Sequence, residues 1–153
     1  MVNVSYWSII TLNVNELNAP TKRQWLVKRY KNKIPLYAVY KKPTSNLVIH
    51  TGWKWSDGKR FHASGDQKKA GIAILISDKT DFEIKTLKRD REGQFIKIKG
   101  SIQEEDITII NIYAPNIGAP QCVRQMLTSM KGELNNNTII VGGFNTPLTP
   151  MNR

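Results

Sequence analysis

The sequence predicts a single α/β domain. Its 153 residues are enough for one domain with a buried core. Short apolar runs rich in β-branched residues alternate with two longer stretches of helical periodicity, which is the pattern of an α/β fold. The chain has no internal repeat, no flexible linker and no apolar run long enough to span a bilayer.

Two kinds of apolar run predict the strands. Residues 71–76, GIAILI, are apolar throughout, which is typical of a strand covered on both faces. Other runs are rich in β-branched residues or alternate apolar and polar side chains, as half-buried strands do. Residues 91–93, REG, suit a hairpin turn between two of them. These other strands are predicted at residues 7–14, 82–89, 94–100, 106–113 and 138–141.

Two segments have the period of an α-helix. Residues 18–33 are predicted to begin a helix at Pro20 and Thr21, with Trp25, Leu26 and Tyr30 facing inward. Residues 119–135 carry a stripe of apolar side chains, and such a stripe packs into a core far more often than it binds a cofactor. The members of the stripe are Val123, Met126, Leu127, Met130 and Leu134.

The net charge of +11 is the strongest feature of the composition. Residues 22–42 hold eight basic residues and no acidic residue. The plainer interpretation is a solvated helix face followed by a loop. The functional one is weak, electrostatic and non-specific binding of DNA or RNA, the commonest polyanions. The basic residues assigned to such binding are Lys22, Arg23, Lys28, Arg29, Lys68 and Lys69.

Several functional classes find no support. The single cysteine, Cys122, has no internal disulfide partner and fits a reducing compartment. The first residues lack the basic start and continuous apolar stretch of a signal peptide, so we expect an intracellular protein of cytoplasm or nucleus, not a secreted or membrane protein. His50 and His62 have no companions at metal-ligand spacing. The segment VGGFN lacks the Gly-Lys-Ser/Thr of a phosphate loop.

Three polar stretches follow apolar runs. They are TLNVNELN at 11–18, NIYAPN at 111–116 and GGFNTPL at 142–148. All three are predicted to lie at the same edge of one sheet, which is where α/β folds place ligands. Taken singly, each stretch is more often an ordinary turn than a site.

Together with nearly all of residues 67–120, these stretches resemble the endonuclease domain of LINE retrotransposons, the part of the reverse-transcriptase polyprotein that belongs to the endonuclease/exonuclease/phosphatase family. The resemblance covers residues 8–32 and 62–153. It implies a two-sheet α/β sandwich flanked by helices that nicks DNA with a divalent metal, Mg²⁺.

The resemblance also implies the site residues. Asn13 matches the Asn that the family places on its first strand, and Tyr113 and Asn116 match residues that lie against the scissile phosphate in relatives. The final family loop reads Gly-Asp-Phe-Asn, in which the Asp orients the attacking water and the Asn supports the developing charge. Here Gly143 replaces that Asp, and Asn145 matches the Asn.

A second departure concerns residues 33–61, which resemble nothing in the family. The family's metal-binding Glu lies in a Gln-Glu-Thr-His stretch, roughly where this chain reads AVYKKPTS at 38–45. If Lys41 and Lys42 are encoded AAG-AAA, a shifted frame reads glutamate there. We therefore hypothesise that 33–61 is a frameshifted insert, and we expect it to be poorly ordered. The sequence of the cDNA tests this.

A third departure is that the chain stops before the family's distal strands and their Asp-His pair. We thus expect an incomplete sandwich, a partial endonuclease-like domain over residues 1–153. Without the Glu, the Asp and the His, we expect a catalytically inactive retroelement remnant with no bound cofactor. Two alternatives stay open: a non-enzymatic interaction protein acting through 33–61, and a residual Mg²⁺-dependent DNA nickase.

Overall fold

The computed structural model describes residues 9–13, 21, 25, 28, 36–41, 58–64, 71–77 and 81–145. Their strands form two sheets of four strands each. The first sheet has the order β1-β2-β4-β3, with β1 parallel to β2 and β4 antiparallel to both of its neighbours. Its strands are β1 (Ile9–Asn13), β2 (Leu36–Lys41), β3 (Gly58–Ser64) and β4 (Gly71–Ser77).

The second sheet has the order β5-β6-β7-β8. β5, β6 and β7 form an antiparallel meander, and β8 returns parallel to β7 after a helical crossover. The turn between β5 and β6 holds Gly93 at a φ of 72°, a left-handed conformation that glycine adopts without strain. The strands are β5 (Phe82–Arg89), β6 (Phe95–Ile102), β7 (Glu105–Tyr113) and β8 (Thr138–Gly143).

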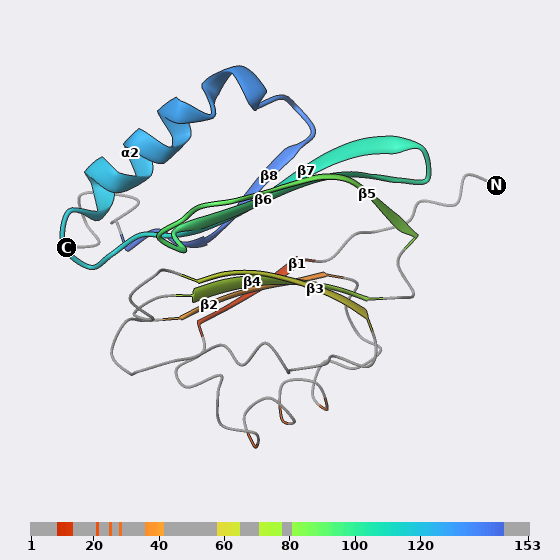
Figure 1. Ribbon diagram of the computed structural model, residues 1–153, viewed down its shortest axis with the longest axis horizontal. Coiled ribbons are helices and arrows are strands. Elements are labelled where there is room, and N and C mark those ends of the chain that lie inside the picture. The colour runs from red at the N-terminus through yellow and green to blue at the C-terminus, as the bar shows by residue number, and fades with distance from the viewer. Residues whose placement is uncertain are drawn as a thin grey trace.

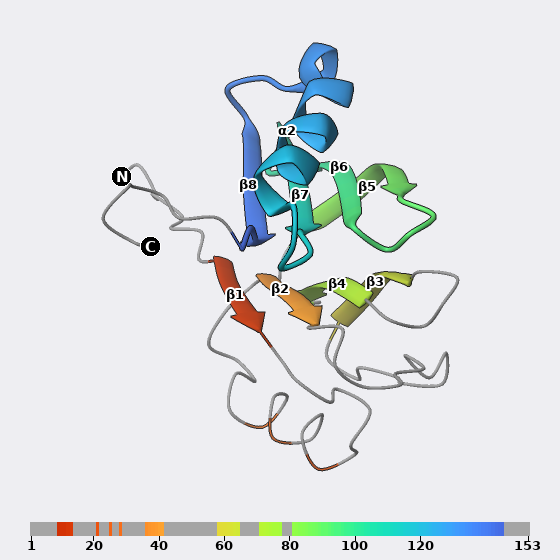
Figure 2. The same cartoon turned by 90° about the vertical axis from the view of Figure 1, so that its left-hand side faces the viewer.

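The two sheets stack face to face, and α2 (Ala119–Ser129) with the short 3₁₀ helix η1 (Lys131–Glu133) covers the outer face of the second sheet (Figure 1, Figure 2). Because side chains alternate across a strand, the second sheet buries residues on both faces. One face contributes Ile96, Ile98 and Ile109 to the core between the sheets. The face under α2 contributes Phe95, Ile110 and Ile112.

The predicted stripe of the second helix is confirmed. Met126 and Met130 are buried, whereas Val123, Leu127 and Leu134 are partly buried against the core. The α-helix is shorter than the predicted 119–135, because the chain tightens into η1 around Gly132 and is extended at Leu134. Glycine has a low helix propensity, which favours an end at this point.

The strands predicted by apolar patterning are found within one or two residues of their expected bounds. β4 is the clearest case, because every residue from Ile72 to Ile76 is buried, as expected for a strand covered on both faces. The structure also places β2 and the first half of β3 inside residues 33–61, where we predicted no strand. Leu36–Lys41 is rich in aromatic and β-branched residues, which fit a pleated sheet. Residues 33–35 and 42–57 lie outside the described residues, and the order of the segment stays a prediction.

The first predicted helix is described only at Thr21, Trp25 and Lys28, all of which are helical and exposed. These positions are spaced i, i+4 and i+7, so they share one helix face. Trp25 is 55% exposed, so the prediction that it faces inward is wrong: it lies on the solvent face that Lys28 shares. Leu26 and Tyr30 lie outside the described residues. None of the described helices is both long and apolar enough to cross a membrane.

Candidate functional site at the strand ends

The polar strand ends gather at one end of the sandwich. β7 and β8 are parallel neighbours in which Tyr113 is paired with Gly143, so both strands end side by side. β1 runs toward the same end of the molecule, on the left of Figure 1, and finishes there at Asn13. The prediction that all three ends lie at the edge of one sheet is wrong, because β1 belongs to the first sheet and pairs with β2.

Two hydrogen bonds join the loops that leave β7 and β8. The backbone N–H of Ala114 donates to the carbonyl of Gly143 over 2.8 Å. In the opposite direction, the side-chain amide of Asn145 donates to the carbonyl of Ala114 over 2.5 Å. Asn145 has a φ of 47°, a left-handed conformation that Asn tolerates better than most residues. Asn145 therefore holds the two loops in register.

The two glycines at the end of β8 differ in backbone conformation and in their contacts. Gly142 has a φ of 133°, and a Cβ at this position would lie 1.9 Å from the carbonyl oxygen of Ile112. The backbones of β7 and β8 thus meet only because residue 142 has no side chain. Gly143 is buried and does not have a positive φ. Since Gly143 is paired with Tyr113, a side chain at 143 would share the sheet face on which Tyr113 lies.

The other predicted site residues differ in exposure. Tyr113 is only 2% exposed, and its backbone N–H donates to the carbonyl of Gln94 over 2.7 Å. Asn116 is exposed, in the bend between β7 and α2. The backbone of Asn13 is paired with Tyr40 of β2, and its side chain lies outside the described part of the structure.

No family model matches the sequence. Solved structures do match: D. rerio TDP2 complexed with a single-strand DNA product has a TM-score of 0.68 at 12% identity over 92% of this chain and 61% of that one. The endonuclease domain of TRAS1, a telomere-specific non-LTR retrotransposon, has a TM-score of 0.60 at 10% identity over 90% and 59%. ANGEL2, a 2′,3′-cyclic phosphatase in complex with adenosine-2′,3′-vanadate, has a TM-score of 0.60 at 11% identity over 86% and 45%.

The chain has the endonuclease/exonuclease/phosphatase fold. It is a two-sheet α/β sandwich, as predicted, and it spans about three fifths of the length of the TDP2 and TRAS1 structures. At these identities the likeness concerns the fold and not the chemistry.

The described residues at the strand ends of this endonuclease/exonuclease/phosphatase fold do not fit Mg²⁺. Tyr113, Asn116 and Asn145 carry neutral side chains, and Mg²⁺ sites in proteins are built on one or two carboxylates. Within 81–145 and the shorter described segments, no three or more His, Cys, Asp or Glu side chains are grouped so that they could hold a metal ion.

The acidic residue Asp90 has a structural role in the turn between β5 and β6. Asp90 follows β5, and its Oδ2 accepts hydrogen bonds from the backbone N–H groups of Glu92 and Gln94 over 3.2 and 3.1 Å. This carboxylate shapes the β5–β6 turn, and the carbonyl of Gln94 then accepts from Tyr113. Asp90 therefore supports the end of β7 indirectly and is engaged in that role.

The end of β2 reaches the same end of the sandwich. Because β1 and β2 are parallel, Asn13 lies beside Tyr40, and β2 ends one residue later at Lys41. This is roughly where the resemblance expects the metal-binding Glu. β2 ends there with a lysine, and the assignment of this position stays a prediction.

Cys122 is a partly buried thiol in α2. Its Sγ lies 3.6 Å from the side-chain oxygen of Gln94. Burial raises the pKa of the Cys122 thiol, and the nearby negative charges of Asp90 and Glu92 raise it further. A raised pKa keeps the thiol protonated at neutral pH, which disfavours a nucleophilic role.

Of the basic residues assigned to nucleic-acid binding, Lys28 is described and its side chain is exposed on the solvent face of its helix. The assignment of the group stays a prediction. Its other members, Lys22, Arg23, Arg29, Lys68 and Lys69, lie outside the described residues.

Sequence reasoning missed Asn111. This residue is fully buried in β7, and its side-chain amide donates to the carbonyl of Ala73 in β4 over 2.9 Å. The bond crosses from one sheet to the other and fixes the spacing of the sandwich just behind the strand ends. The available signal was Asn111 inside the otherwise apolar run IINIY at 109–113, since a polar residue there needs a buried partner.

Proposed function

We propose that this chain is a remnant of the metal-dependent DNA endonuclease domain of a LINE-type retroelement, without nuclease activity, that binds nucleic acid weakly and without sequence specificity. The observation that carries the proposal is the pair of strand-end loops after β7 and β8. They are joined through Asn145 and Ala114, and residue 143 at the end of β8 is a glycine.

Loss of activity follows from the chemistry of phosphodiester cleavage. The reaction needs a cation held by carboxylates to neutralise charge on the pentavalent phosphate, and an oriented water as nucleophile. In the resemblance, Gly143 stands where an Asp orients the water, and Lys41 stands near the position of the metal-binding Glu. A lysine near the metal position would repel Mg²⁺ instead of binding it.

Binding of nucleic acid rests on charge. The net charge of +11 produces an attractive field for phosphates within about a Debye length, roughly 8–10 Å. The exposed Lys28 is one cation of the assigned group. Such binding depends steeply on salt, because each neutralised phosphate releases condensed counterions.

The first experiment separates activity from binding. The purified chain is incubated with supercoiled plasmid and Mg²⁺, and its affinity for a fluorescent single-stranded oligonucleotide is measured by anisotropy at several salt concentrations. We expect no relaxed plasmid, and a plot of log affinity against log salt whose slope is about −0.7 for each phosphate contacted. Metal-dependent nicking would instead support the residual nickase.

A pair of matched charge variants locates the binding. In one variant, the six assigned residues Lys22, Arg23, Lys28, Arg29, Lys68 and Lys69 become Gln. In the control, six exposed basic residues elsewhere become Gln: Lys85, Lys88, Arg89, Arg91, Arg124 and Lys131. Both lower the net charge of +11 by six. We expect the first variant to reduce the salt slope clearly more than the control.

An equal reduction of the salt slope in both variants would mean that binding depends on net charge alone. It would contradict the assignment of binding to these six residues. No binding at low salt would contradict the nucleic-acid part of the proposal and favour the interaction protein that acts through residues 33–61. In either case the nicking assay still reports on activity separately.

A further inference from the structure

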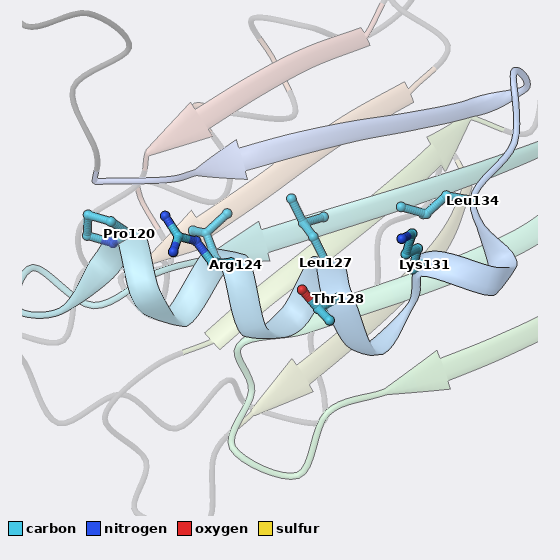
Figure 3. A pocket seen from close by; sticks show the side chains of 7 residues that line it. Pro120, Arg124, Leu127, Thr128, Lys131 and Leu134 are labelled. Atoms are coloured by element: carbon cyan, nitrogen blue, oxygen red, sulfur yellow. The ribbon is translucent and has the colours of Figure 1, made fainter.

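A groove of about 560 Å³ runs along α2, outside the strand-end site (Figure 3). Its lining belongs to α2, η1 and the residue after η1, on the side of the helix where β8 runs (Figure 2, Figure 3). The lining residues are Pro120, Val123, Arg124, Leu127, Thr128, Lys131 and Leu134. Because one helical row lines it, the groove is open and elongated, which suits a rod-shaped ligand better than a compact one.

The floor of the groove is aliphatic. Val123, Leu127 and Leu134 are partly buried against the core, so their inner atoms are fixed by packing while their outer atoms face the groove. No aromatic side chain lines it, so it offers no surface on which a nucleic-acid base could stack. A phosphate backbone likewise gains nothing from aliphatic contact.

The rim of the groove is basic. Arg124 and Lys131 are exposed, and no Asp or Glu is among the lining residues. The two cations are seven positions apart, or about two helical turns, with Arg124 in α2 and Lys131 at the start of η1. Two carboxylates spaced by two helical turns on a docked helix would match this separation.

We propose that this groove binds an acidic amphipathic helix of a partner protein. The apolar face of that helix covers Val123, Leu127 and Leu134, and two of its carboxylates, seven positions apart, pair with Arg124 and Lys131. Complementary charge selects this occupant over a neutral or basic helix, and the net charge of +11 speeds the encounter with an acidic partner. The inference is independent of the strand ends and of the proposed function.

The probe is a synthetic fluorescent peptide that forms a helix, with leucines at i, i+3, i+4 and i+7 on one face and two glutamates seven positions apart beside them. Its charge-inverted twin carries lysines in place of these glutamates. Anisotropy measures binding of each to the full chain. We expect saturable binding of the acidic peptide and at least about ten-fold weaker binding of the basic twin.

Two variants of the protein carry the test. The double variant Arg124→Glu and Lys131→Glu should weaken binding of the acidic peptide by about ten-fold and strengthen binding of the basic twin. The control, Arg89→Glu with Arg91→Glu, changes the net charge by the same amount at exposed positions outside the groove and should change neither affinity more than about two-fold. All four positions are exposed, so circular dichroism should show folded chains.

The apolar contact needs its own variant. Thr128 is exposed and lines the groove, so Thr128→Trp fills it without disturbing the core. We expect a loss of acidic-peptide binding in this variant with unchanged oligonucleotide affinity. If the acidic peptide does not bind, or binds equally to the double variant and its control, the proposal is wrong. It is also wrong if the double variant lowers oligonucleotide affinity more than the control while peptide binding is absent, since the groove would then be a nucleic-acid surface.

Discussion

β4 and β7 occupy the same place in their sheets, third in the strand order, and both are almost wholly buried where they cross the core. Their chemistry differs. β4 is apolar from Ile72 to Ile76, whereas β7 carries Asn111 two residues before it ends at Tyr113 beside Gly143. The same degree of burial thus serves two roles: β4 provides packing, and β7 provides packing together with fixed polar positions.

The difference predicts how each strand tolerates change. In an apolar strand such as β4, a lost methylene costs the transfer energy and a small cavity. Around β7, the backbone contact with Gly142, the inter-sheet bond of Asn111 and the ion pair of Lys97 depend on single atoms. Changes there should cost more free energy of unfolding per atom than changes in β4.

The largest effect is expected from Gly142→Ala. A Cβ at this position would lie 1.9 Å from the carbonyl oxygen of Ile112, and the φ of 133° is strained for any residue with a side chain. β8 must move away from β7, with a loss of about 3 kcal/mol or more in the free energy of unfolding. Urea unfolding followed by circular dichroism measures this.

The matched control for this prediction is Gly132→Ala. Apart from its chain neighbours and its own helix, nothing lies within 4 Å of where a Cβ on Gly132 would be, and this residue is exposed in η1. This substitution should change the free energy of unfolding of the protein by less than about 1 kcal/mol. Equal effects of the two substitutions would contradict the close approach of β7 and β8.

The second prediction concerns the bond between the sheets. Asn111→Leu keeps a similar volume but removes the donor to Ala73, and a buried carbonyl without its donor costs about 1–3 kcal/mol. We expect a loss of about 2 kcal/mol by urea unfolding. The comparison is Ile74→Val in β4, which should cost about 0.5–1.5 kcal/mol. A larger loss at Ile74 would reverse the contrast between the two strands.

The third prediction concerns Lys97, which is paired with Ile110 of β7 and lies under η1 at 4% exposure. Its ammonium forms an ion pair with Glu133. Glu133 is 40% exposed, so solvent screens part of the attraction, and Glu133→Gln should cost about 1 kcal/mol at pH 7. Asp106→Asn, which removes the exposed pair with Lys85, is the control and should cost less than about 0.5 kcal/mol.

The pH dependence of this variant follows from the direction of the pKa shift. Burial lowers the pKa of Lys97, and the positive charges of Lys88 and Lys99 lower it further. Between the folded pKa and its ordinary value the unfolded chain binds more protons, so this group makes stability rise as the pH rises through that window. As Lys97 loses its proton, it also loses its ion pair with Glu133. The loss of stability caused by Glu133→Gln should therefore be smaller at pH 9.5 than at pH 7. A loss that grows with pH would contradict a depressed pKa.

Much of the fold could be predicted from local pattern. β4 to β8 and the stripe on α2 follow from alternation, apolar runs and helical period, all of which are set by neighbouring residues. β2 was missed because its segment resembles no family sequence, although Leu36–Lys41 has the residue types of a strand. Trp25 was misplaced because residues 18–33 hold few apolar side chains, so the helical period alone does not decide which face is inward.

The site could be predicted only in part. The clustering of the strand ends of β7 and β8 follows from their sequence, because polar residues follow apolar runs. The assignment of β1 to the other sheet depends on pairing with β2, a non-local contact that no local pattern encodes. The partner of Asn111 is Ala73, 38 residues away in the sequence, so its need for a partner was readable but the identity of that partner was not.

The smallest expected effect is that of Gly143→Asp on nicking. The new carboxylate would lie beside Tyr113 on the same sheet face, where the resemblance places a group that orients water. One such group does not create a metal site, because the described residues at this end, Tyr113, Asn116 and Asn145, add only neutral oxygens. We expect no nicking of supercoiled plasmid with Mg²⁺ above that of the unchanged chain, with circular dichroism confirming that the variant is folded.

Two further variants decide what this negative result means. Lys41→Glu combined with Gly143→Asp places a second carboxylate at the end of β2, next to β1 in the sheet, and should raise the affinity for Mn²⁺ measured by electron paramagnetic resonance relative to Gly143→Asp alone. Asn145→Ala removes the amide that joins the two loops. Because we expect no nicking by the unchanged chain, we expect none by this variant either. Mg²⁺-dependent nicking by the unchanged chain, abolished by Asn145→Ala, would mean that the strand ends around β7 form a working site after all.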